Sequence, residues 1–376
     1  MPLQIIREYL RKTDLDGWLL YDFSGSNEFF YKASGINAHL TRRSFFWIPK
    51  KGDPVLLLHK VEEDGFGGAS FRIASYLTVG DLVEALRSLA KGKIAMEIDD
   101  EVPYVSKVDA SGLHLVSEAG IRPVSSKVLI QLVFSRISEA LLETHLKASH
   151  LLDTINTKAF EYIRMRRSAG KPVFEGDVAL FITDRIKTSH LVSEHGPIVA
   201  FGENTASPHY RVQGGGRQLG EGDPILIDLW GKTEGGIYAD FTYMGVCGKP
   251  SSRHKEVFQL VLEAQKIVFA YIKAHLEPEG WKVDHEVQHF FAKKKVEKSV
   301  FHRTGHNIHE SLHGPGAHLD SIEIKDTRPI LPMTVTSVEP ALYLADFGAR
   351  LENNIYTDAK GKPHWSRPLQ TAWILV

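Results

Sequence analysis

The stretch that decides the fold reads ILIDLW at 225–230 and IYADFTYMGV at 237–246, two apolar runs joined by the turn-rich GKTEGG. Apolar runs of this kind, separated by glycines, predict a β-hairpin. Each strand carries one acid, and we expect Asp228 to lie opposite Asp240 on one face, with Cβ atoms about 5 Å apart. Two carboxylates held that close repel each other unless a cation lies between them. The hairpin therefore predicts a metal site.

A second acid-bearing hairpin lies nearer the C-terminus. Glu339 stands in TVTSVEPALYL (334–344), which returns through ADFG to Glu352 in ARLENNIY (349–356). The opposed strands place Arg350 beside Glu352 on the same face, so that a fixed cation borders the site without being a ligand. One acid alone is usually a solvated surface group. Two acid pairs on apolar hairpins, with His306 between them in sequence, instead indicate a pair of divalent metal ions.

Composition fits an enzyme of the cytoplasm. A chain of 376 residues suggests two domains. A net charge of −1 provides no global field to recruit nucleic acid or an anionic membrane. Cys247 is the only cysteine, which excludes an intramolecular disulfide, and MPLQIIREYLRK at the N-terminus lacks the apolar core of a signal peptide. No stretch is long and apolar enough to span a bilayer. We expect a cytoplasmic protein with no nucleic-acid or membrane partner.

Periodicity divides the chain into two parts. Residues 1–125 alternate helix-like and strand-like segments, which predicts a small α/β domain. A long helical pattern then runs from Ser138, a predicted N-cap, to Arg167. Further helices are expected in VFEGDVALFITDRIK (173–187), at 252–276 and at 282–297, interleaved with the acid-bearing strands. We place an N-terminal α/β domain at 1–130 and an α+β catalytic domain at 131–376.

The segment HESLH (309–313) matches H-E-x-x-H, in which two histidines bind a single zinc ion only if all five residues lie on a helix. Gly305 precedes the segment and Gly314-Pro315-Gly316 follows it at once, which leaves little room for a helix. The extended motif also fails, because Leu319 stands in the place of its third histidine. We therefore do not expect a single-zinc helical site.

The five candidate ligands follow one another in a fixed order along the chain. The Asp pair on a hairpin comes first, followed by a histidine in HRTGH (302–306), a glutamate in SVEPALY (337–343) and a glutamate in ARLEN (349–353). This order resembles the metallopeptidase family of prolidases, aminopeptidases P and methionine aminopeptidases. The resemblance implies a pita-bread catalytic domain, preceded here by a smaller creatinase-like α/β domain. The segment IVAFGENTASPHYRV (198–212) looks like the family stretch that supplies a histidine beside the metals, which maps to His209.

The resemblance also implies the site. Two divalent ions per subunit would be held by Asp228, Asp240, His306, Glu339 and Glu352. Glu339 is similar to the family's general base, His209 and His313 to the histidines that steady the scissile carbonyl and shuttle protons, and His302, His313 and Arg350 would contact the substrate. Independently, hard carboxylates with one imidazole favour Mn²⁺, which we expect first, or Zn²⁺, Co²⁺ or Fe²⁺. Two such ions about 3.5–4 Å apart can share a hydroxide that is nucleophilic at neutral pH.

The separate N-terminal domain resembles the bacterial Xaa-Pro peptidases, whose relatives commonly form homodimers. Short proline-containing peptides are then the expected substrates, and we favour an Xaa-Pro dipeptidase over an aminopeptidase P that acts on longer peptides. A dipeptidase needs a cation for the proline carboxylate, for which Lys325, Arg328 and Arg350 are candidates. A creatinase-type hydrolase and a metal-free binding module are the alternatives from other classes. The complete set of five ligands argues against the first, and metal analysis of the purified protein would separate both from a dinuclear peptidase.

Overall fold

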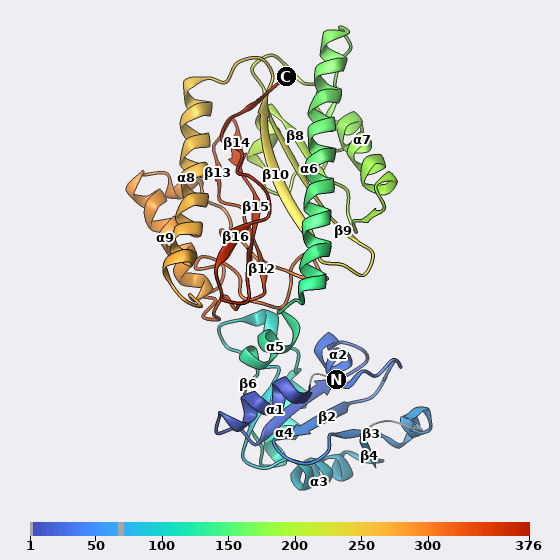
Figure 1. Ribbon diagram of the computed structural model, residues 1–376. Coiled ribbons are helices and arrows are strands. Elements are labelled where there is room, and N and C mark those ends of the chain that lie inside the picture. Colours follow the sequence, from blue (N-terminus) through green and yellow to red (C-terminus); the bar gives the residue numbers. More distant parts are fainter. Residues whose placement is uncertain (1–2, 67–70) are drawn as a thin grey trace. The chain divides into compact units, whose positions relative to one another are not determined.

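The computed structural model describes residues 3–66 and 71–376. The chain divides into two compact units, Met1–Phe134 and Ser135–Val376. Figure 1 shows both units. The boundary that we predict between residues 130 and 131 falls inside helix α5 (Lys127–Phe134).

The N-terminal unit is built on a six-stranded mixed sheet with the strand order β4-β3-β2-β1-β5-β6. Its core is formed by apolar side chains of the central strands and of the helices that pack on them. The predicted alternation of helix and strand is confirmed. The strands are β1 (Gly17–Asp22), β2 (Ser44–Pro49), β3 (Val55–His59), β4 (Arg72–Tyr76), β5 (Lys93–Met96) and β6 (Arg122–Ser125). The helices besides α5 are α1 (Leu3–Arg11), α2 (Glu28–Ser34), α3 (Val79–Leu89) and α4 (Ala110–Glu118), with 3₁₀ turns η1 (Lys60–Phe66) and η2 (Pro103–Val105).

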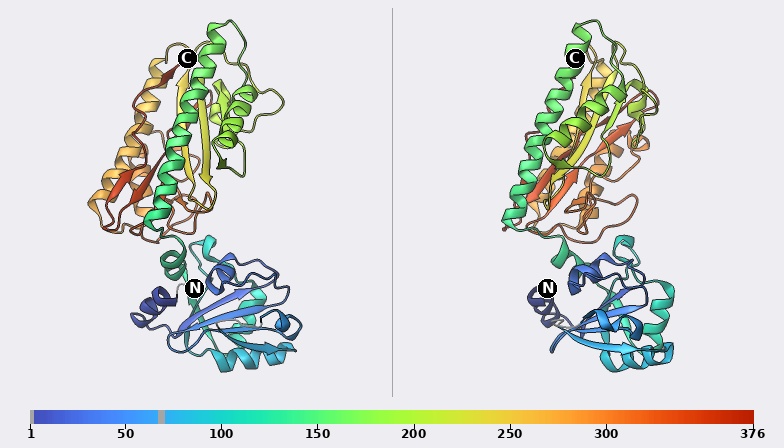
Figure 2. Two further views of the ribbon diagram at one scale, coloured as in Figure 1. Left: turned by 45° about the vertical axis from the view of Figure 1, so that its right-hand side comes forward. Right: turned by 90° about the vertical axis from the view of Figure 1, so that its right-hand side faces the viewer.

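The C-terminal unit begins with the long helix α6 (Glu139–Ser168), and the Ser138 hydroxyl accepts a hydrogen bond from the Leu141 N–H, as predicted for its N-cap. Figure 2 shows α6 running along the β9–β10 hairpin. The elements of this first half are α7 (Glu175–Thr188), β7 (Leu191–Val192), β8 (Ile198–Phe201), η3 (Gly202–Ala206), β9 (Pro224–Thr233) and β10 (Ala239–Val246).

The second half repeats the plan of two helices followed by antiparallel strands. The predicted helices appear as α8 (Ser252–Ala274) and α9 (Gly280–Lys293). The remaining elements are η4 (Glu297–Ser299), β11 (Asn307–Ile308), β12 (Val335–Val338), β13 (Ala341–Tyr343), β14 (Gly348–Arg350), β15 (Asn353–Thr357), β16 (Pro363–Trp365) and β17 (Ile374–Leu375). Strands β11, β12, β15 and β16 form one sheet, β13 pairs with β14, and β17 joins the edge of β10.

Two apolar cores sandwich the strands between helix pairs (Figure 1). One core packs α6 and α7 against β8, β9 and β10. The other packs α8 and α9 against β10 and strands β12–β15. This α+β arrangement is the predicted pita-bread architecture. Within 3–66 and 71–376, no helix combines the length and apolar character needed to cross a membrane.

Candidate metal centre

The β9–β10 hairpin forms as predicted, but its register differs from the prediction. Asp228 pairs with Thr242, and Asp240 pairs with Trp230. The reason lies in the turn, because the N–H groups of Ile237 and Tyr238 bond to Thr144 Oγ1 and the His309 carbonyl and do not pair with β9. The two aspartates therefore lie diagonally, a relationship that places residues about 7–8 Å apart. The shift by two residues still keeps both on the same face.

The second hairpin is interrupted where its two acids lie. Strand β12 pairs with β15 as far as Val338 and Asn353, pairing resumes between Ala341 in β13 and Arg350 in β14, and Glu339 and Glu352 fall in the gap. Pro340 has no N–H for the ladder. The Gln265 side chain of α8 donates to the carbonyls of Val338 and Leu351 at 3.1 and 2.9 Å, which fills the gap.

The freed backbone groups in this gap join the ligand-bearing segments to one another. The Glu339 N–H donates to the Thr304 carbonyl at 2.8 Å, and the Glu352 N–H donates to the Thr242 carbonyl at 3.1 Å. One acid is thus tied to the loop before His306 and the other to the Asp240 strand. The gap in the hairpin positions both glutamates against the remaining ligands.

His306 is held by its own loop. A Cβ on Gly305 would collide with the Ser337 carbonyl, so only glycine allows the loop to lie this close to β12. The His306 N–H donates to Ser337 Oγ at 2.9 Å, and its Nδ1 lies 3.1 Å from the Asn307 carbonyl. A proton on Nδ1 leaves the Nε2 lone pair free to bind a metal, the usual arrangement for a ligating histidine.

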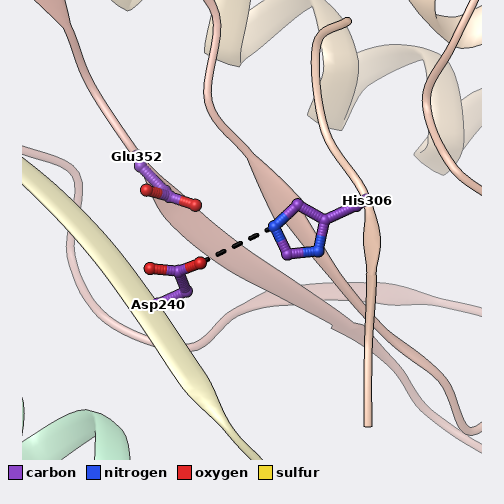
Figure 3. A group of neighbouring side chains, drawn as sticks. All are labelled: Asp240, His306 and Glu352. Atoms are coloured by element: carbon purple, nitrogen blue, oxygen red, sulfur yellow. Dashed lines mark ion pairs between the residues drawn. The ribbon is translucent and has the colours of Figure 1, made fainter. Parts of the chain in front are cut away.

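Asp240, His306 and Glu352 converge from three segments (Figure 3). One ligand atom from each residue lies within 4.8 Å of the other two, and all three residues are buried. His306 Nε2 is 3.6 Å from Asp240 Oδ2 and 3.5 Å from Glu339 Oε1. Separations of this size suit ligands around one ion, because metal–ligand bonds of about 2.0–2.2 Å place neighbouring ligand atoms near 3 Å or more apart.

Unsatisfied oxygens test whether a cation fits. Among the described residues, Asp228 Oδ1, Asp240 Oδ1 and Glu352 Oε1 are buried oxygens without a hydrogen-bond partner. Buried polar atoms normally have partners, so an orphaned carboxylate oxygen within a group of acids is suited to bind a cation. The five predicted residues therefore fit a divalent-metal centre.

The pKa shifts of the clustered acids also indicate a cation site. Burial raises the pKa of Asp240, and burial together with the neighbouring carboxylates raises that of Glu352 well above its usual range. Burial also opposes the charge of Glu339, but nearby imidazoles, that of His306 first, lower the pKa of this carboxyl overall. Burial and mutual repulsion destabilise the ionised carboxylates of this site, and a bound cation would stabilise them.

Arg350 borders the centre as predicted. Its Nη2 lies 2.6 Å from Asp228 Oδ2, its Nε donates to Thr242 Oγ1 at 3.1 Å, and its Nη1 donates to the Pro208 carbonyl at 3.0 Å. The Thr242 hydroxyl in turn donates to Glu352 Oε2 at 2.9 Å. Burial raises the pKa of Asp228, and the Arg350 charge acts against that rise. Arg350 thus fixes the orientation of the Asp228 carboxylate.

His302 is linked to Arg350 through a tyrosine. Arg350 Nη1 donates to Tyr343 Oη at 2.8 Å, and Tyr343 Oη lies 2.8 Å from His302 Nε2. His302 Nδ1 lies 2.7 Å from the Arg303 carbonyl, so the imidazole donates there and accepts from the tyrosine. Phe301, exposed at the surface, stacks on Tyr343 with ring centroids 5.4 Å apart.

His313 and His209 lie at the exposed side of the centre. The His313 and His306 rings are 4.2 Å apart, and the pKa of His313 is lowered to about 3, first by the charge of His306, then by burial, and less by Arg303 and His209. His209 is exposed in the loop after η3. Residues 309–313 form bends, so the prediction that this segment is no helical zinc motif is confirmed.

A model of metallopeptidase family M24 matches residues 143–359, more than half of the chain. The chain belongs to metallopeptidase family M24. Membership confirms the prediction of a metallopeptidase and, with the ligand cluster, of a divalent-metal cofactor. Among similar proteins, a probable dipeptidase PepE of Mycobacterium bovis is 24% identical over 323 residues, 84% of this chain and 80% of that protein. An uncharacterised peptidase YqhT of Bacillus subtilis is 28% identical over 166 residues, 44% of each chain.

Solved structures share the fold of this M24 peptidase. Dipeptidase PepE from Mycobacterium ulcerans has a TM-score of 0.74 at 19% identity, covering 100% of this chain and 96% of that one. An Xaa-Pro dipeptidase from Bacillus anthracis has a TM-score of 0.68 at 19% identity, with 100% and 99% covered. A prolidase from Thermococcus sibiricus has a TM-score of 0.67 at 21% identity, with 100% and 98% covered.

The sequence pattern did not point to several residues that shape the centre of this M24 peptidase. Thr242 could have been found, because it lies two residues after Asp240 and so on the same face of β10. Tyr343 and Gln265 carry no such signal, since their contacts join segments far apart in sequence. Arg303 was also missed, although its charge lowers the pKa of both Glu339 and His313.

Proposed function

We propose that this M24 peptidase is an Xaa-Pro dipeptidase that works with two divalent metal ions. The proposal is supported by the ligand atoms of Asp240, His306 and Glu352, which lie within 4.8 Å of one another, and by the buried, unpartnered oxygens of Asp228, Asp240 and Glu352. Asp228, Asp240 and Glu352 would hold one ion, and Asp240, His306, Glu339 and Glu352 the other. Four carboxylates and one imidazole favour Mn²⁺ first, or Zn²⁺, Co²⁺ or Fe²⁺. Such ions supply Lewis acidity and lower the pKa of bound water.

Glu339 is the group that we propose as general base. Its side chain is 17% exposed, whereas those of Asp240 and His306 are 7% and 3% exposed, so it is the ligand that reaches toward an incoming peptide. The Ser337 hydroxyl donates to Glu339 Oε1 at 3.1 Å and fixes that oxygen. The other oxygen is then available to take a proton from the attacking water and to deliver it toward the leaving proline nitrogen.

The histidines have separate tasks in this proposal. His209 and His313, both exposed beside the buried ligands, are placed to donate hydrogen bonds to the scissile carbonyl or to move protons. His302, whose Nε2 accepts from Tyr343, lines the pocket without being a ligand. Arg350 contributes positive charge, but its contacts with Asp228, Tyr343 and Pro208 suit it to orienting the site more than to a direct grip on the substrate.

Arg303 is our candidate for the cation that receives the proline carboxylate. Its side chain is 10% exposed, its Nη1 lies 3.9 Å from Asp320 and 3.6 Å from Glu323, and its charge acts on Glu339 and His313. Arg328 is less suited, because Asp326 binds its Nη2 at 2.6 Å and its Nε at 2.9 Å. A cation beside the catalytic groups favours a substrate that ends soon after the scissile bond.

Hydrolysis of Gly-Pro, Ala-Pro and Leu-Pro, compared with Xaa-Pro-Xaa tripeptides in Mn²⁺, Co²⁺ or Zn²⁺, tests the proposal. We expect kcat/KM for the dipeptides to be at least about tenfold higher. Arg303→Gln should raise KM for Ala-Pro and leave Ala-Pro-amide, which lacks the carboxylate, nearly unchanged. Preference for tripeptides would instead indicate an aminopeptidase, the activity named for a structure from Thermotoga maritima that has a TM-score of 0.63 to this chain. No Xaa-Pro cleavage with any metal would reject both.

A further inference from the structure

Glu175, the first residue of α7, is a fully buried acid whose four hydrogen-bond donors all come from the segment 201–217. Its Oε1 accepts from the Phe201 N–H at 2.7 Å and from Asn204 Nδ2 at 2.9 Å. Its Oε2 accepts from Tyr210 Oη at 2.8 Å and from the Arg217 N–H at 2.7 Å. Hydrogen bonds to a charged acceptor are about twice as strong as neutral ones, so one side chain holds both ends and the middle of the loop.

Backbone contacts keep Glu175 itself in place against this loop. The Glu175 N–H donates to the Arg217 carbonyl at 3.1 Å, and the Gly176 N–H donates to the Gly215 carbonyl at 3.0 Å. A Cβ on Gly216 would lie 2.7 Å from Glu175 Oε2, so glycine is needed where the loop closes over the carboxylate. The start of α7 and the end of the loop therefore form one rigid junction.

His209 stands in the middle of the loop, and both of its neighbours are tied down. The Pro208 carbonyl accepts from Arg350 Nη1 at 3.0 Å, and Arg350 binds the proposed ligand Asp228. Tyr210 donates to Glu175 and lies 3.0 Å from Asn204 Nδ2. An exposed imidazole is thus carried on backbone that is fixed to the metal centre on one side and to a buried acid on the other.

We propose that Glu175, acting through Tyr210, is a positioning residue that holds His209 over the metal centre. The inference rests on the proposed function through the role given to His209. Rate acceleration by a proton-transfer group depends on its placement, and a shift of about 1 Å can cost about 10²-fold. A surface loop reaches that precision only when a rigid scaffold supports it.

The decisive variant is Tyr210→Phe, which removes the hydroxyl and keeps the ring packed on the core of the C-terminal unit. It is made in the wild-type chain and in His209→Ala. We expect kcat on Ala-Pro to fall about tenfold in the wild-type background, with unchanged metal content and KM, and less than twofold in His209→Ala, because residues that act through one another are not additive. Equal losses in both backgrounds, or no loss in either, would overturn the proposal.

Tyr271→Phe is the matched control, since Tyr271 packs on the same core but lies on α8. It should change kcat by less than twofold.

Hydrogen exchange provides a readout that needs no substrate. In Tyr210→Phe, amides of 202–216 should exchange at least about tenfold faster than in the wild-type chain or in Tyr271→Phe. If the wild-type protein cleaves no Xaa-Pro peptide, the proposed function is rejected. The exchange rates of residues 202–216 still show whether Tyr210 holds the loop. Unchanged exchange would reject the positioning role whatever the substrate. Full activity of His209→Ala would show that His209 has no role in turnover. Glu175 and Tyr210 would then position no catalytic group.

Discussion

Arg350 Nη2 lies 2.6 Å from Oδ2 of Asp228, while Oδ1 of the same carboxylate has no hydrogen-bond partner. The two oxygens therefore differ: one is held by a buried guanidinium and the other is left for a cation. The same guanidinium reaches Tyr343 and the Pro208 carbonyl. One residue thus connects the proposed metal ligand Asp228 to the segments that carry His302 and His209.

Glu339→Gln should lower kcat at least about 10³-fold and weaken metal binding. The change removes one ligand charge and the proposed base together, a loss of at least about 4 kcal/mol in transition-state stabilisation. Steady-state kinetics on Ala-Pro at saturating Mn²⁺ measure it. Turnover near the wild-type rate would rule out a two-metal mechanism with Glu339 as base.

His209→Ala should lower kcat/KM by about 10²-fold while the protein keeps its metals. The residue lies outside the ligand set, in an exposed loop, and a positioned proton-transfer group usually contributes this much. Metal analysis and dipeptide kinetics on the same preparation decide the matter. Loss of the metals would make His209 a ligand, and full activity would make it an ordinary loop residue.

Acid should weaken the C-terminal unit through His145. Its Nδ1 lies 2.7 Å from the Tyr238 carbonyl and its Nε2 2.7 Å from Ser366 Oγ, and burial lowers its pKa to about 4. The unfolded chain takes up this proton near pH 6.5 and the folded one only near pH 4. Stability is therefore complete above pH 6.5 and falls as the pH drops toward 4, by about 3 kcal/mol.

The test uses His145→Asn, which keeps a donor toward the Tyr238 carbonyl. The free energy of unfolding, taken from exchange of α6 peptides in urea, should fall less steeply between pH 6.5 and 4 in this variant. His150→Asn, exposed on the same helix, is the control and should keep the wild-type slope. Equal slopes in all three proteins would contradict the assignment.

We propose that this chain forms a homodimer, as its resemblance to the Xaa-Pro peptidases implies. The N-terminal unit exposes the apolar side chains of Val61, Leu77 and Val79 at 67%, 66% and 59%, which a partner chain could cover. Light scattering at micromolar concentration should give the mass of two chains, and Leu77→Glu should weaken the association. A fully active monomer would refute the expectation.

The chain sequence predicts the helices and strands well because their apolar periodicity is strong. The helix after Ser138, the helices α8 and α9 and both acid hairpins follow directly from it. The register of the β9–β10 hairpin is harder to predict than its strands. Whether Asp228 lies opposite Asp240 depends on which groups accept hydrogen bonds from the N–H groups of Ile237 and Tyr238. Those partners, Thr144 and His309, are far away in sequence.

The residues of the site, too, can be predicted only in part from the sequence. Ligand identity can be predicted because residue type and order carry it. The groups that orient the ligands cannot, because their contacts exist only in the folded chain: Gln265 reaches the gap in the second hairpin from α8, and Tyr343 joins Arg350 to His302. The role of Glu175 likewise depends on the folded chain, because its four hydrogen-bond donors come from one loop.

We propose that five residues of one centre hold two divalent ions. The most direct measurement is an anomalous difference map from a crystal of the full chain grown with Mn²⁺. We expect two peaks per chain, one contacting Asp228 and the other contacting His306 and Glu339, with Asp240 and Glu352 touching both. A single peak, or strong peaks only elsewhere on the chain, would contradict it.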